Sequence, residues 1–121
     1  MRLDVVQLLA AADELATFLY SKGSRKIRVS WDFGVERSYC AITAPDLVLA
    51  EADRAALEAV FADPVQPEVA AYYGGLAGRH RDGSELELLG AMTELEELLT
   101  GEGLGTRIVV SRREAEAFPA R

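Results

Sequence analysis

The residues of this sequence that could carry out chemistry are concentrated in one glycine-rich segment. It contains the only histidine, His80, between two arginines in Arg79-His80-Arg81-Asp82, with Gly83 directly after. Histidine can exchange a proton near neutral pH, arginine can bind anions, and glycine lets the backbone approach a phosphate closely. The segment could therefore be a phosphate cradle, part of a kinase catalytic loop, or a flexible strap.

The kinase interpretation of this segment finds no support in the rest of the chain. The catalytic loop of a eukaryotic-type protein kinase works with a nucleotide-covering glycine loop, a strand lysine and a metal-binding Asp-Phe-Gly motif. A chain of 121 residues is too short to contain that machinery. His80 has no nucleophile or second ligand near it in sequence. We therefore favour a solvated loop, with an anion site at Arg79 and Arg81 as the alternative.

Two tyrosines that precede this segment suggest a different kind of function. Tyr72 and Tyr73 lie next to Gly74-Gly75, and aromatic side chains are frequent anchors in protein interfaces. One tyrosine could equally close the core while the other covers its edge. The glycines allow the segment to move as a lid or docking strap. The candidate partner-binding residues are Tyr72, Tyr73, Arg79, His80 and Arg81.

Composition and charge restrict the class of protein. Half of the residues are hydrophobic and 27% are charged, as in a folded globular domain. We expect one domain over residues 1–113 and a frayed tail at 114–121. The net charge of -7 disfavours binding to nucleic acid or to an anionic membrane. The first residues lack the features of a signal peptide, so a cytoplasmic protein is expected. The single cysteine, Cys40, excludes an intramolecular disulfide and lies in an apolar run that predicts an inert buried thiol.

The first half of the chain shows two kinds of hydrophobic periodicity. A repeat of three and four residues predicts a helix from Leu3 to Tyr20, and Gly23 can take the left-handed cap conformation after it. Alternation by two then predicts a strand whose buried face carries Ile27, Val29, Trp31 and Phe33. A second strand is predicted from Arg37 to Ala44. The short connection between the two strands predicts an antiparallel hairpin.

The second half returns to helical periodicity from Leu49 to Phe61, and Pro67 is well placed to begin another short helix. A further helix is predicted from Glu85. Propensity alone extends it to Leu99, although residues 93–99 could instead be a strand. A final strand is predicted from Thr106 to Ser111. This order predicts an α+β fold, a two-layer sandwich with a mostly antiparallel sheet and the helices on one face.

The order of elements, taken with particular residues, resembles a known ATP-binding domain. These residues are Asp13-Glu14-Leu15-Ala16-Thr17, the hairpin from Lys26 to Ala44, the run from Glu85 to Met92, and the ending Gly103-Leu104-Gly105-Thr106-Arg107-Ile108-Val109-Val110. They resemble the GHKL or Bergerat fold shared by histidine kinases, DNA gyrase and the serine-kinase-like anti-sigma factors. The resemblance covers nearly the whole chain. It implies that residues 93–99 form a strand.

The resemblance implies a catalytic site on the first helix, and this sequence alters it. In the family, that helix presents Glu-Leu-x-x-Asn, in which the glutamate positions the attacking group and the asparagine oxygen binds Mg²⁺. Glu14 and Leu15 match the motif, but Phe18 stands at the asparagine position. A phenyl ring offers no oxygen to Mg²⁺, so the family's protein ligand for the metal is absent.

The two nucleotide-contacting motifs of the family are altered as well. The adenine-binding Asp-x-Gly-x-Gly motif corresponds to Thr43 to Leu49, which contains no glycine, and Asp46 is the residual candidate for an adenine contact. Of the phosphate-binding glycine motif, Gly83 remains as the residual candidate. Glu85 and Glu87 add negative charge near the start of the following helix, where a phosphate would otherwise be attracted.

We therefore expect a noncatalytic GHKL-like module that binds another protein as a regulatory component, without a cofactor or metal. Acidic charge and exposed aromatics are also compatible with a homodimer. The first alternative is an active ATP- and Mg²⁺-dependent kinase or anti-sigma factor, with Glu14 as base and Asp46 reading adenine. The second alternative is a sensor that binds a non-nucleotide small molecule in the residual pocket.

Overall fold

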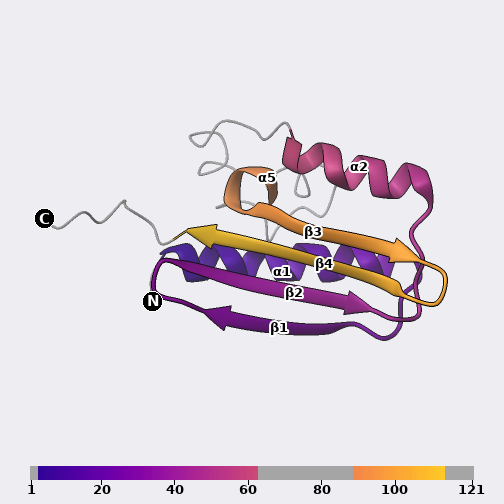
Figure 1. Ribbon diagram of the computed structural model, residues 1–121, viewed down its shortest axis with the longest axis horizontal. Coiled ribbons are helices and arrows are strands. Elements are labelled where there is room, and N and C mark those ends of the chain that lie inside the picture. The colour runs from indigo at the N-terminus through magenta and orange to yellow at the C-terminus, as the bar shows by residue number, and fades with distance from the viewer. Residues whose placement is uncertain (1–2, 63–88, 114–121) are drawn as a thin grey trace, which may run out of the picture.

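The computed structural model describes residues 3–62 and 89–113 (Figure 1). In chain order, its elements are α1 (Leu3–Ser21), β1 (Arg28–Phe33), β2 (Arg37–Ala44), α2 (Glu51–Ala62), α5 (Leu89–Met92), β3 (Glu94–Gly101) and β4 (Gly105–Arg113). The two long predicted helices, the hairpin and the final strand are confirmed with small shifts at their ends. The short helix predicted at Pro67, the helix start predicted at Glu85 and the tail at 114–121 lie outside the described residues.

The four strands form one antiparallel sheet in the order β1-β2-β4-β3. β1 and β2 form one hairpin, and β3 and β4 form the other. β2 and β4 pair in the middle, so the segment that carries α2 and α5 connects a central strand to an edge strand. The described part of the chain is therefore α+β, compatible with a two-layer sandwich, with α1 behind the sheet in Figure 1.

The main core lies between α1 and the two central strands. Along β2, the side chains alternate between buried Cys40 and Ile42 and the opposite-facing Tyr39, Ala41 and Thr43, which is the period of two of a strand. The fully buried leucines of α1 are Leu8, Leu15 and Leu19. Each such leucine contributes roughly 2 kcal/mol of hydrophobic stabilisation. Cys40 is buried as predicted, and desolvation raises the pKa of its thiol to about 11.

The predicted burial of one face of β1 is only partly correct. Val29 is half-buried, but Trp31 and Phe33 on the same face have exposed fractions of 40% and 52%. The reason is topological, because β1 is an edge strand and α1 packs chiefly on β2 and β4. Alternation in the sequence identified the strand and its face, whereas the sheet order determined how much of that face is covered.

The segment that the sequence left open between helix and strand is the strand β3, beginning at Glu94. A bulge between Leu95 and Glu97 inserts one residue into its pairing with β4. The insertion breaks the alternation by two, so Leu95 and Leu98 both lie on the α1 side of the sheet although they are three positions apart. That spacing of leucines is also helical, so hydrophobic periodicity does not correct the helix propensity that left the segment open.

Candidate functional site at the ends of α1 and β2

Phe18, at the position where the resemblance implies a metal ligand, is part of the hydrophobic packing. Its ring is half-buried and packs against the main core cluster. The ammonium of Lys22, the residue directly after α1, lies 5.6 Å from the centre of the ring. Glu14, the residual catalytic candidate, is half-buried one turn before Phe18. This part of α1 therefore presents an aromatic ring beside a cation, where Mg²⁺ coordination would require oxygen atoms.

The end of α1 turns the chain toward the loop that follows β2. Gly23 has a φ of 115°, and its N–H donates to the Tyr20 carbonyl at 3.0 Å while the Ser24 N–H donates to the Leu19 carbonyl at 3.1 Å. This is a Schellman cap, which requires a left-handed residue that glycine supplies without strain. The cap confirms the predicted role of Gly23 and positions Ser24 and Arg25.

Asp46, the residual adenine candidate, holds these two residues. Its Oδ1 accepts a hydrogen bond from the Ser24 hydroxyl at 2.8 Å, and its Oδ2 accepts one from the Arg25 backbone N–H at 2.7 Å. The Arg25 N–H bond, followed by the Ser24 bond, lowers the pKa of the Asp46 carboxyl. The side chain therefore connects the α1–β1 loop to the loop after β2, and each of its oxygens has a partner within the chain.

Two threonine hydroxyls hold the other side of the same loop. Thr106 Oγ1 donates to the Leu47 carbonyl at 2.8 Å, and Thr100 Oγ1 accepts from the Leu49 N–H at 2.9 Å. The two hydroxyls are 2.9 Å apart. Because the Thr106 proton goes to a carbonyl, the bond between the hydroxyls must use the Thr100 proton. The result is a directed chain of hydrogen bonds from one loop N–H to one loop carbonyl.

Gly105, at the start of β4, allows this loop to approach closely. Its φ is 73°, and a Cβ at this position would lie 2.6 Å from the Pro45 Cα and 2.7 Å from the Ala44 carbonyl oxygen. Both contacts are with backbone atoms, which cannot move aside as the end of a side chain can. Glycine is therefore required here on two grounds, its left-handed φ and the space that it leaves for the loop.

An ion pair connects α1 and α2 at the same end of the molecule. Lys22 Nζ lies 3.1 Å from Asp53 Oδ1, which joins the end of α1 to the first turn of α2.

The loop at 45–49 is held on both sides by four side chains. We call them the loop anchor: Ser24, Asp46, Thr100 and Thr106. Among the described residues, Phe18 and Asp46, to which the resemblance gives nucleotide-site positions, therefore make contacts within the protein.

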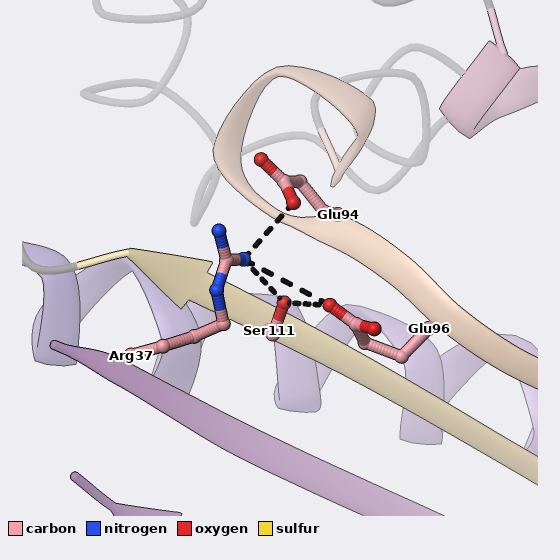
Figure 2. Close-up of polar contacts among 4 residues, drawn as sticks. All are labelled: Arg37, Glu94, Glu96 and Ser111. Carbon is pink, nitrogen blue, oxygen red and sulfur yellow. Dashed lines mark hydrogen bonds and ion pairs between the residues drawn. The ribbon is translucent and has the colours of Figure 1, made fainter.

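A second polar cluster lies at the other end of the sheet (Figure 2). Arg37 Nη1 of β2 donates to Glu94 Oε1 at 2.9 Å and to the Ser111 hydroxyl at 2.8 Å. Ser111 in turn donates to Glu96 Oε2 at 2.6 Å. The β3 bulge makes this possible, since Glu96 is the inserted residue. We call Arg37, Glu94, Glu96 and Ser111 the Arg37 cluster.

The remaining sequence-predicted site residues lie outside the described part of the chain. They are Tyr72, Tyr73, Arg79, His80, Arg81 and Gly83. Phe18 and Asp46 lie at the same end of the molecule, and Glu14 is one turn of α1 further away. Sequence reasoning missed the hydroxyls of Thr100 and Thr106 as loop contacts. A usable signal was Gly105-Thr106 directly before a β-branched strand, where glycine marks a close backbone approach.

Over residues 3–62 and 89–113, no group of three or more His, Cys, Asp or Glu side chains is placed to hold a metal ion. No helix of the described chain is long and apolar enough to cross a membrane. No protein-family model matches the sequence, and no curated protein matches it either.

Proposed function

We propose that this chain is a noncatalytic module with a GHKL-like architecture that works by binding another protein. The observation that carries the proposal is the position of Phe18, whose ring packs against the core at the site where the resemblance implies an oxygen ligand for Mg²⁺. Phosphoryl transfer depends on a metal ion that bridges and neutralises the phosphates. Without its ligand, a site on α1 loses the main organiser of that reaction.

The contacts of Asp46 support the same proposal. A carboxylate that reads adenine must face the nucleotide and accept a hydrogen bond from its amino group. Here both carboxylate oxygens bind the α1–β1 loop, and these hydrogen bonds favour the charged form and lower the pKa of the carboxyl. The loop anchor also fixes the neighbouring backbone at Leu47 and Leu49. These groups contribute to folding in place of nucleotide contact.

Isothermal titration calorimetry tests the proposed loss of nucleotide binding. ATP and ADP are titrated into the full chain with Mg²⁺ and, in a matched series, with the metal removed by a chelator. We expect no saturable heat in any of the four titrations. Micromolar binding that requires Mg²⁺ would overturn the proposal, and turnover of ATP that is lost in Glu14→Ala would establish the enzyme alternative in its place.

A variant at Phe18 makes this test sharper. Phe18→Asn supplies the missing amide oxygen in a side chain of smaller volume, and circular dichroism shows whether the fold is retained. Because Asp46 and the other residues of the loop anchor keep their hydrogen bonds within the chain, we expect the folded variant to give no Mg²⁺-dependent heat with ATP. Recovery of such heat would show that Phe18 alone blocks a site that is otherwise intact, and it would contradict the part of the proposal that rests on Asp46.

A further inference from the structure

The two edge strands of the sheet differ in how they are protected. The pairing of β3 is interrupted by its bulge, and α2 and α5 pack beside this strand. β1 pairs with β2 through every residue from Arg28 to Phe33 without a register shift, and no described element pairs with its outer edge (Figure 1). Such an edge presents unpaired backbone N–H and C=O groups that can bind another strand.

The charges on β1 are arranged symmetrically. On the face away from α1, the exposed side chains of Arg28 and Asp32 lie two positions before and two positions after Ser30. Among the described residues, neither has an ion-pair partner. They carry opposite charges at equal distances from one central residue, so the strand is complementary to a second copy of itself that runs in the opposite direction.

We propose that the chain forms a symmetric dimer by antiparallel pairing of β1 with β1 of a second copy, about a two-fold axis at Ser30. In this register, residues at equal distances from Ser30 face each other. Arg28 faces Asp32 of the second copy, and Asp32 faces Arg28 of the second copy. Opposite charges at directly facing positions stabilise an antiparallel pair, and the symmetry makes both pairs equivalent.

The apolar face of β1 fits the same register. Trp31 faces Val29 of the second copy, because each lies one position from Ser30. Residues that face each other across an antiparallel pair lie on the same face of the sheet, so this contact is on the apolar face. Trp31 and Phe33, which α1 leaves exposed, then border the second copy and lose contact with water. An axis that passes through a residue also keeps the two α1 helices on the same side of the joined sheet.

Other symmetric registers that keep α1 on one side match the charges less well. An axis at Asp32 places two aspartates opposite each other, which is destabilising. An axis at Trp31 places Asp32 opposite Ser30 and leaves Arg28 without a charged partner inside the strand. An axis at Val29 places Arg28 opposite Ser30, so that Asp32 meets only Lys26, which precedes β1. The axis at Ser30 is the one that pairs both charges within the strand.

Charge reversal with mixing tests this dimer and its register. Arg28→Asp makes both positions negative, and Asp32→Arg makes both positive, so each variant alone brings like charges together at two symmetric places. We expect each to weaken self-association about ten- to a hundredfold relative to the unmodified chain. An equimolar mixture of the two variants restores both opposite-charge pairs and is expected to form a heterodimer. Sedimentation velocity over a concentration series up to millimolar chain measures the association.

Matched controls separate the interface from general effects of charge. Arg107→Asp and Glu102→Arg make the same changes of charge on β4 and in the β3–β4 turn, away from β1, and are expected to leave the association unchanged. Trp31 is the only tryptophan of the chain, so its fluorescence reports on this edge directly. We expect its emission to shift to shorter wavelength as dimer forms.

Three results would overturn the inference. The first is a chain that stays monomeric at millimolar concentration. The second is a dimer that withstands both charge reversals, since it must use another surface. The third is a mixture that fails to associate although circular dichroism shows both variants folded, which would exclude this register.

The inference does not depend on the proposed loss of nucleotide binding, because β1 lies outside the α1 site and the calorimetric test can fail independently.

Discussion

The two polar clusters at opposite ends of the sheet are built in different ways. In the loop anchor, side chains bind one another and also bind backbone groups: Asp46 accepts from the Arg25 N–H, and the two threonine hydroxyls bind the Leu47 carbonyl and the Leu49 N–H. In the Arg37 cluster, the bonds join side chains of three strands to one another. The first cluster therefore fixes the course of the chain, whereas the second joins strands that already pair.

This difference determines what each cluster contributes to stability. A backbone group that loses its partner in a packed region carries a desolvation penalty of about 1–3 kcal/mol. An exposed ion pair contributes less, because water and salt screen it. We therefore expect the partly buried threonine contacts of the loop anchor to be more important than the Arg37 cluster, and their contribution to be insensitive to salt. Four predictions test this comparison.

The largest effect is expected from Gly105→Ala. The substitution adds a Cβ against the backbone of Ala44 and Pro45 at a φ of 73°. The left-handed conformation and the overlap together cost roughly 2–5 kcal/mol. Gly103→Ala is a matched control, because it has a φ of 81° but no atom within 4 Å of its Cβ, and it should cost roughly 1–2 kcal/mol. Urea unfolding measures both, and equal losses would show that close approach of the loop is unimportant.

Thr106→Val is expected to have the next largest effect. Valine keeps the shape of threonine but removes the hydroxyl that donates to Leu47 and accepts from Thr100, so the cost should be about 1–3 kcal/mol. Thr17→Val removes a hydroxyl that binds the Asp13 carbonyl on the exposed side of α1, and should change stability by less than about 0.5 kcal/mol. If urea unfolding shows the same loss of stability for both variants, the hydrogen bonds through Thr100 and Thr106 do not contribute significantly to stability.

Asp46→Asn should reduce stability in a pH-dependent way. The native contacts lower the pKa of this carboxyl from 3.8, so the unfolded state takes up a proton at a higher pH than the folded state does. The stabilisation by the charged form is therefore present above 3.8 and is lost as pH falls through the lowered native pKa. We expect the difference between wild type and variant to be greatest at neutral pH and to shrink on acidification.

Chemical denaturation over a pH series measures this difference. Glu102→Gln, in the β3–β4 turn, removes one negative charge elsewhere and serves as the control. A difference between wild type and Asp46→Asn that stayed constant from neutral to acidic pH would contradict the role of the Asp46 charge in binding the α1–β1 loop.

The smallest effect is expected from Arg37→Ala. The Arg37 side chain is 23% exposed and its partner Glu94 is 68% exposed, so the loss should be about 0.5–1 kcal/mol at low salt. It should become smaller at high salt, whereas the cost of Thr106→Val should not change. Unfolding of both variants at two salt concentrations checks this, and a salt-independent loss at Arg37 would remove the distinction between the clusters.

The sequence was sufficient for elements whose periodicity is uninterrupted. α1, β2 and β4 could be predicted as elements, and Gly23 could be predicted as the cap, because these features depend on neighbouring residues. β3 could not be settled, because its residues have helix propensity and one inserted residue gives its leucines a spacing that helices also have. The exposure of Trp31 could not be predicted either, because it depends on the order of strands and on where α1 lies.

The candidate site was less predictable than the fold, for a related reason. Asp46 follows a proline at the end of a strand, and aspartate at such a position suggests a turn contact. Its partner Ser24 is 22 residues away in sequence, and only the folded arrangement identifies it. Phe18 could be recognised as a residue that cannot bind Mg²⁺, but its packing against the core became visible only in the structure.

The buried thiol of Cys40 makes the packing of α1 on the sheet measurable. It faces the helix from the centre of β2, and its pKa of about 11 leaves almost no reactive thiolate at neutral pH. An alkylating reagent can therefore reach and modify the sulfur only when the helix separates from the strands. Because the chain has a single cysteine, the rate of its modification reports how often this layer opens.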